Sequence, residues 1–289
     1  MFRVETPHAG QGAVTRIRMG RTVLGRTLHE VSAYRIGDLL VDSGPPPTAS
    51  RLVEWCRTAR EYDPVCRVVL SHHHEDHSGG AAALGTELGL PVQAPESAVP
   101  ILAEGLRMPL YRRLVWGRPR RFRAEPLEET EELVARTSAG ELRFRVIRTP
   151  GHAFTHVCLW EASRRWLVSG DLYVHPRVRY LRRVEDVWAH LESLRRVLAL
   201  GPEVLICGHA GLVEDARGAL EAKIAWWEGL AGEARSLRER GWPVRKITRR
   251  LLGREGPLHY LSFGDFSKAN LVRSLLREDT QPRPEAAPS

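Results

Sequence analysis

The chain has 289 residues, of which 43% are hydrophobic, so it can bury a sizeable core and is not expected to be mainly disordered. Its formal charge is +8, but lysine occurs only at Lys223, Lys246 and Lys268, and the many arginines are spread along the sequence. Spread charge of this kind suits an ordinary solvated surface. Nucleic acid is therefore an alternative partner that the charge alone does not favour.

The compartment can be predicted from what the sequence lacks. The N-terminus has no apolar stretch of signal-peptide length, and no window of about 18 apolar residues could span a bilayer. The four cysteines form no C-x-x-C pair, which argues against a disulfide scaffold or a structural zinc knuckle. We expect a cytoplasmic protein with reduced thiols and no membrane partner.

In the first hundred residues, predicted strands alternate with predicted helices. Extended segments are expected at 14–19, 29–36 and 39–44, with a hairpin turn at Gly37 and Asp38. Helical spacing follows at 48–62, a β-branched run at 66–72, a second helix at 78–90 and a short strand at 91–95. This alternation predicts an α/β protein whose sheets are covered by helices.

Residues 105–128 interrupt this alternation, because proline, glycine, arginine and aromatic residues mix there without a helical or strand period. We expect an insertion or lid. Strands are predicted at 141–149, 156–162, 164–171 and 202–209, with an amphipathic helix at 184–200. The predicted organisation is a catalytic domain at 1–215, a helical cap or winged-helix-like segment at 216–278, and a disordered tail at 279–289.

The densest group of chemically active side chains follows the strand predicted at 66–72. His72 and His74 face the same side of an extended backbone, because side chains alternate with a period of two. Asp76 and His77 fall where the chain turns into a helix, so they can diverge toward a second ion. His73 and Glu75 are expected to point away and not to be ligands.

This spacing resembles the signature of the metallo-β-lactamase superfamily, with glyoxalase II-like enzymes nearest by motif. The rest of that pattern follows in order, each part after an apolar run: His152 in TPGH, Asp171 in SGD and His209 in CGH. The resemblance covers roughly residues 13–215. It implies an αββα sandwich, here with a C-terminal helical segment added.

The resemblance also implies roles for these residues. The set His72, His74 and His152 would hold one metal ion and the set Asp76, His77 and His209 a second, with Asp171 bridging them. Zinc suits these nitrogen and oxygen ligands, and iron or manganese also accept them. Two ions about 3.5–4 Å apart lower the pKa of a bridging water. Hydroxide is then the expected nucleophile, and Asp76 the catalytic residue that orients it.

Supporting and substrate-binding residues are less strongly indicated. Asp42 resembles a family position that braces the site, and His156 would either support a ligand or pack within a strand. Tyr173 or His175, close after Asp171, is expected to contact substrate. The arginine-rich insertion, represented by Arg112 and Arg113, would bind a carboxylate or phosphate or form a solvated arm. Packing or surface positions are expected for His8, His29, His190 and His259.

Three functions compete on the sequence alone. The first is a dinuclear hydrolase acting on a small ester, thioester or lactone, which would be anionic if the insertion's arginines face the site. The second is a phosphodiesterase or nuclease, with which the positive charge and the winged-helix-like residues 244–253 are compatible. The third is a mononuclear iron dioxygenase of the persulfide type. The C-terminal helices could close the pocket, form a homodimer or bind nucleic acid, and fold alone does not decide.

Overall fold

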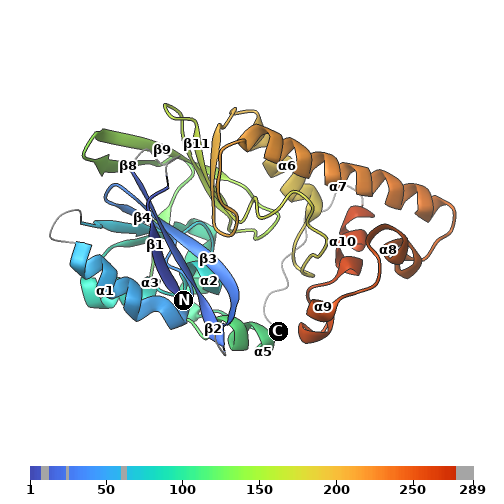
Figure 1. Cartoon of the computed structure of the whole chain (residues 1–289), viewed down its shortest axis with the longest axis horizontal. Coiled ribbons are helices and arrows are strands. Elements are labelled where there is room, and N and C mark those ends of the chain that lie inside the picture. The colour runs from blue at the N-terminus through green and yellow to red at the C-terminus, as the bar shows by residue number, and fades with distance from the viewer. Residues whose placement is uncertain (8–12, 24–25, 60–63, 278–289) are drawn as a thin grey trace.

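The structure is a computed structural model, and it describes residues 1–7, 13–23, 26–59 and 64–277. Two β-sheets face each other, and helices cover both outer faces (Figure 1). Three buried clusters match these layers: one lies between the sheets and one lies on each outer face. The predicted αββα sandwich is therefore confirmed.

The first sheet has seven strands, ordered as in the sequence. They are β1 (Phe2–Glu5), β2 (Val14–Val23), β3 (Arg26–Ile36), β4 (Leu39–Val41), β5 (Arg67–Val69), β6 (Val92–Pro95) and β7 (Glu125–Leu127). The pairs from β1 to β4 are antiparallel, and those from β4 to β7 are parallel. The hairpin between β3 and β4 turns at Gly37, whose φ of 56° suits glycine.

The second sheet has six strands, β8 (Glu132–Thr137), β9 (Gly140–Arg148), β10 (Val157–Glu161), β11 (Trp166–Gly170), β12 (Val204–Cys207) and β13 (Gly211–Val213). All neighbouring pairs are antiparallel except β11 and β12. In β9, Leu142, Phe144 and Val146 are buried against the first sheet, while the charged residues between them are exposed. This alternation is what a sheet with one buried face requires.

The helices form the outer layers and the C-terminal segment. The helices α1 (Ala49–Ala59), α3 (Ala81–Leu88) and α4 (Val99–Glu104) supply side chains to the core beside the first sheet. The helices α6 (Val187–Leu198) and α7 (Ala216–Glu239) pack on the second sheet. Beyond α7 follow α8 (Val244–Leu252), α9 (Pro257–Leu261) and α10 (Lys268–Leu275); Figure 1 shows α8 and α10 below α7, with α9 farther from it.

Two segments differ from the sequence-based prediction. The stretch 105–128 is not irregular throughout: it contains α5 (Leu110–Trp116), and its end forms β7 at the edge of the first sheet. Because α5 has only seven residues and stops at Gly117, where φ is 89°, it is too short to show a helical period. The strand β8 was not predicted, because its apolar run from Leu133 to Ala135 is only three residues long and lies between the charged residues Glu132 and Arg136.

The described part of 216–277 contains helices and no sheet strand, so the wing expected of a winged-helix segment has no counterpart there. Ser267 caps α10 by accepting a hydrogen bond from the Ala269 N–H. The predicted tail at 279–289 and His8 lie outside the described residues. Of the helices described, none is both long and apolar enough to cross a membrane.

Candidate metal centre

The candidate site lies at one edge of the sandwich, where strands from both sheets end. His72 and His74 follow β5, and the short helix α2 (Glu75–Ser78) carries Asp76 and His77. His152 follows β9, Asp171 follows β11 and His209 follows β12. Since these strand ends meet at the same edge, side chains from distant parts of the chain converge there, as the sequence predicted.

One group of side chains consists of His72, His74 and His152. His74 Nδ1 lies 3.0 Å from His72 Nε2 and 2.9 Å from His152 Nε2. Three ring nitrogens pointing at one another offer lone pairs to a common point. Their burial lowers the pKa values of His72 and His74 well below the usual range, so both rings are held neutral, which is the form that binds metal.

A second group consists of Asp76, His77 and His209, whose candidate ligand atoms lie within 4.8 Å of one another. His209 Nε2 is 3.5 Å from Asp76 Oδ2. Asp171 lies between the two groups: its Oδ2 is 3.3 Å from His152 Nε2 and 3.5 Å from His209 Nε2, and its Oδ1 is 3.2 Å from His77 Nε2. The carboxylate of Asp171 is thus placed to contact ions on both sides.

The unsatisfied atoms of the cluster fit a cationic occupant. Asp76 Oδ1, His77 Nε2 and Asp171 Oδ1 are buried and make no hydrogen bond to the described residues. Burial disfavours the charged ring of His209, yet the carboxylates of Asp171 and Asp76 outweigh burial and raise its pKa to about 10. Native proteins rarely leave such atoms unpaired. A divalent ion would satisfy all three atoms. It would also replace the proton that Asp76 and Asp171 stabilise on His209.

In four of the five candidate histidine ligands, the ring nitrogen that faces away from the cluster contacts an oxygen atom. His72 Nδ1 contacts Ser71 Oγ, His77 Nδ1 contacts Asp42 Oδ2, His209 Nδ1 contacts the Glu30 carbonyl and His152 Nδ1 lies 3.4 Å from Glu185 Oε1. Each of these oxygens can accept a ring N–H, which leaves the inward nitrogen free to bind metal. His74 differs, because its Nε2 lies 3.2 Å from Arg182 Nη1: when Nδ1 binds metal, Nε2 carries the ring proton and cannot accept from the guanidinium.

Asp42 and His156 stabilise the loops that carry the candidate ligands. Asp42 accepts hydrogen bonds from the Ser71 N–H at 2.8 Å and from the Ser71 hydroxyl, in addition to its contact with His77. His156 Nε2 accepts from the Asp171 N–H at 3.1 Å, and burial lowers the pKa of His156 to about 3. Both residues lie behind the cluster, Asp42 in the bracing position expected from the resemblance.

Gly208 shows how tightly the strand ends approach. A Cβ atom at this position would lie 2.6 Å from the His77 ring and 2.8 Å from Asp171 Oδ1. Real side chains do not tolerate such contacts. The glycine before His209 is therefore required for the β11 and β12 ends to come together.

A cavity of about 310 Å³ adjoins the cluster, within the range of small-molecule sites. Candidate ligands on its wall include Asp76, His152, Asp171 and His209. The rest of the wall is largely apolar and comes from α5, residues 174–181 and the C-terminal helices: Val115, Trp116, Val174, Val178, Leu181, Trp227, Leu258 and Phe266. The metal centre thus opens onto an apolar chamber.

The four predicted substrate contacts lie in different places relative to this cavity. Arg112 lines the cavity, but it is buried, and its Nε donates to Glu75 Oε1 at 2.5 Å while Nη2 lies 3.6 Å from Asp76 Oδ1. Arg113 is exposed and does not line the cavity. Tyr173 packs in the core beside α7, and His175 is exposed and accepts from the Arg177 N–H. Neither lines the cavity, because the chain after Asp171 turns these side chains elsewhere.

Contacts between the insertion and the C-terminal segment join two walls of the cavity. Tyr111 of α5 donates its hydroxyl to Asp265 Oδ2 at 2.5 Å, and Arg182 Nε donates to the same oxygen at 3.2 Å. Asp265 therefore joins two walls of the cavity. The ring of Tyr111 also lies against Phe266, with ring centroids 6.4 Å apart.

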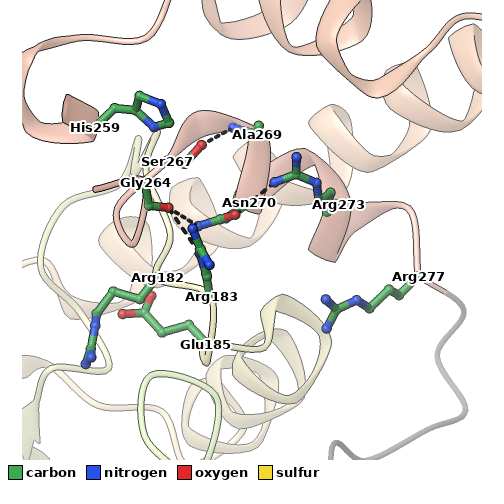
Figure 2. Close-up of a pocket in the computed structure, with 10 residues that line it drawn as sticks. All are labelled: Arg182, Arg183, Glu185, His259, Gly264, Ser267, Ala269, Asn270, Arg273 and Arg277. Atoms are coloured by element: carbon green, nitrogen blue, oxygen red, sulfur yellow. Dashed lines mark hydrogen bonds between the residues drawn. The ribbon is translucent and has the colours of Figure 1, made fainter. Parts of the chain in front are cut away.

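The loop that carries Arg182 and Glu185 is held by α10 and the residues before it. Leu181 and Ser267 exchange backbone hydrogen bonds of 3.2 and 3.1 Å. Figure 2 shows Arg183 and Arg273 gathered near Asn270 at a second cavity of about 480 Å³ beside this loop. The C-terminal segment therefore helps to hold Arg182 against His74 and Glu185 against His152.

Sequence reasoning missed several residues of the cavity wall. Lys223 and Trp227 of α7 and His190 of α6 line it, although 14 or more residues separate each of them from the nearest candidate ligand. His29 also lines it and lies against Trp116. Packing was the expected role of His29 and His190, and no motif links either to the site. The scarcity of lysine was the one feature that could have singled out Lys223.

Comparison with known proteins identifies the family. The profile of the metallo-β-lactamase superfamily matches residues 26–209, which include all seven candidate ligands. The chain belongs to this superfamily. The match agrees with the resemblance seen in the sequence and with the αββα architecture.

Three relatives show how similar individual proteins are to this chain. A hydroxyacylglutathione hydrolase from Bdellovibrio bacteriovorus is 28% identical over 169 residues, covering 57% of this chain and 56% of the relative. A metallo-β-lactamase family protein from Thermus thermophilus is 23% identical, with a TM-score of 0.61 and coverage of 90% of this chain and 92% of that chain. A protein solved in a di-iron-bound form is 28% identical, with a TM-score of 0.54 over 70% of this chain and 96% of that chain.

We predict that Asp42→Asn lowers the affinity for divalent metal about 10- to 100-fold, because the oxygen that fixes His77 Nδ1 is weakened as an acceptor. Asparagine tolerates the φ of 62° found at this position, so the fold should be kept. Competition with a chromogenic chelator measures the change. Asp215→Asn, at the N-cap of α7, is the matched control. Equal metal affinity in Asp42→Asn and wild type would contradict the bracing role.

We predict that Arg112→Met lowers the free energy of unfolding by about 3–5 kcal/mol, because Glu75 stays buried without its partner. The neighbouring Arg113→Met should change it by less than about 0.5 kcal/mol, since that side chain is exposed. Adding Glu75→Gln to Arg112→Met should recover part of the loss. Urea unfolding of the four proteins tests the pairing, and similar costs for the two arginines would rule it out.

Proposed function

We propose that the protein is a metal-dependent hydrolase with a dinuclear centre, acting on a small ester, thioester or lactone. The observation that carries the proposal is the convergence of seven candidate ligands in three overlapping groups, one of which joins Asp171 to His72 and His77, with three buried atoms unsatisfied. Hydroxyacylglutathione hydrolases among the relatives support the hydrolase class. A relative with two bound irons supports a centre of two metals, zinc or iron.

The seven residues would divide as the sequence predicted. His72, His74 and His152 would hold one ion, and Asp76, His77 and His209 the other, with Asp171 between them. Two divalent ions would lower the pKa of a bound water. They would also supply positive charge near the leaving oxygen or sulfur.

Asp76 is suited to orient the attacking water. Burial alone would raise its pKa, but hydrogen bonding to His209 and the charges of His77 and Arg112 hold the pKa below its usual range. An ionised Asp76 can accept a hydrogen bond at Oδ1, which makes none to the described residues. Arg112, 3.6 Å away, keeps that carboxylate in place.

The cavity favours a small substrate with an apolar part. Its volume of about 310 Å³ suits an acyl group, and most of its wall is apolar. We further propose that residues 1–215 form the catalytic part and that the helices of 216–278 act as its cap, since Lys223, Trp227, Leu258 and Phe266 complete the wall. A pocket that excludes water strengthens the electrostatic interactions within it.

We predict about two equivalents of zinc, iron or manganese per purified chain, because seven ligands exceed what one tetrahedral ion uses. Elemental analysis after purification measures this, and a panel of thioesters, lactones, simple esters and phosphodiesters then identifies the bond cleaved. One tightly bound iron with oxygen uptake would favour the dioxygenase instead. Cleavage of phosphodiesters alone would favour the nuclease.

We predict that Asp76→Asn lowers kcat at least about 100-fold, as expected for the loss of a positioned catalytic group, while the fold is kept. Metal content must be measured on the same sample, because Asp76 is also a candidate ligand. Reloading with excess metal separates the two effects. Near-normal turnover by the metal-loaded variant would remove Asp76 from the catalytic step, and Asp215→Asn serves again as the unaffected control.

A further inference from the structure

Lys223 is a buried cation on the wall of the cavity beside the candidate metal centre. It projects from α7, and only 1% of its surface is exposed. Its Nζ donates to the Leu172 carbonyl at 3.0 Å and lies 4.8 Å from the centre of the Trp227 ring. The surrounding core is apolar, and burial lowers the pKa of Lys223 to about 8.

The charge of Lys223 has no ionic partner. No carboxylate oxygen in the described part of the chain lies within 4.0 Å of its Nζ, whereas the other basic residue on this wall, Arg112, is paired with Glu75. The Leu172 carbonyl does not require the lysine, because His190 Nε2 already donates to it at 2.7 Å. The charges of Glu185 and Asp171 partly offset the burial that lowers the pKa of Lys223, although neither carboxylate forms a direct ion pair with it. A buried ammonium without a direct ion pair is costly to keep. The folded protein thus retains a cation that no contacting carboxylate neutralises.

We propose that Lys223 binds a carboxylate carried by the substrate, so the enzyme acts on small esters or thioesters whose apolar acyl chain bears a second, negatively charged group. This assignment rests on the proposed hydrolase function. The apolar wall around Trp227 and Leu181 would contact the chain, while the candidate metal centre on the same cavity would contact the reacting carbonyl. A charge-assisted hydrogen bond inside an apolar chamber is stronger than one in water.

The test measures binding and does not depend on turnover. Isothermal calorimetry on the zinc-loaded full-length protein compares straight-chain monocarboxylates with dicarboxylates of the same length, from four to eight carbons. One carboxylate can occupy the metal centre and the other can reach Lys223. At one chain length, we expect the dicarboxylate to bind at least about tenfold more tightly than its monocarboxylate. An absence of preference at every length in the wild type overturns the proposal.

Two variants test whether the charge is responsible. Lys223→Met and Lys223→Gln should bring the dicarboxylate preference close to one. Glutamine keeps a donor for the Leu172 carbonyl, so a purely structural role would be rescued by Gln and not by Met. The matched control is Lys268→Gln: Lys268 is also buried, but it donates to the Leu252 and Arg254 carbonyls and does not line the cavity. A wild-type preference in Lys223→Gln overturns the proposal.

The outcomes separate this inference from the proposed function. If the dicarboxylate preference depends on Lys223 but no ester or thioester is cleaved, the hydrolase proposal fails and the binding assignment stands. If neutral esters are cleaved and the Lys223 variants lower kcat equally for neutral and carboxylated substrates, without changing the binding preference, Lys223 acts at the reacting carbonyl. The carboxylate assignment is then wrong while the hydrolase proposal holds.

Discussion

Two buried carboxylates, Asp76 and Asp171, surrounded by five imidazoles set the requirements for the rest of the structure. Isolated buried carboxylates are strongly disfavoured, so they persist only where cationic or hydrogen-bonding groups face them. Here the facing groups come from strand ends of both sheets, which makes the sandwich edge the one place where all seven can meet. The outer hydrogen bonds that the rings donate to Asp42, Ser71 and the Glu30 carbonyl then fix the rings that face inward.

The candidate ligands could be predicted because their geometry is local. His72 and His74 share a face of an extended segment, and Asp171 and His209 directly follow apolar strands that pair in parallel. The other candidate ligands could be predicted because the order of the motifs along the chain resembles that of the superfamily. The layered fold was equally accessible, since strands such as β9 show the alternation of a sheet with one buried face.

The substrate side of the site could not be predicted in the same way. Closeness to Asp171 in sequence suggested Tyr173 and His175, but the direction of a side chain in a turn depends on packing, and the cavity is lined instead by Val174 and Val178. Arg112 was expected to meet substrate, yet tertiary packing pairs it with Glu75. These contacts depend on how the C-terminal segment packs. The spacing of apolar residues within one helix or strand does not predict such packing.

The cavity wall joins segments that are far apart in the sequence, and the hydrogen bond from Tyr111 to Asp265 connects two of them across 154 positions. The candidate metal-binding loops lie at the sandwich edge, whereas much of the opposite wall lies on α5, α7 and the chain near α9. Substitutions in those helices can therefore reshape what enters the chamber without disturbing the strand ends. Such a division allows natural variation to diversify substrate preference while the reactive centre is inherited unchanged.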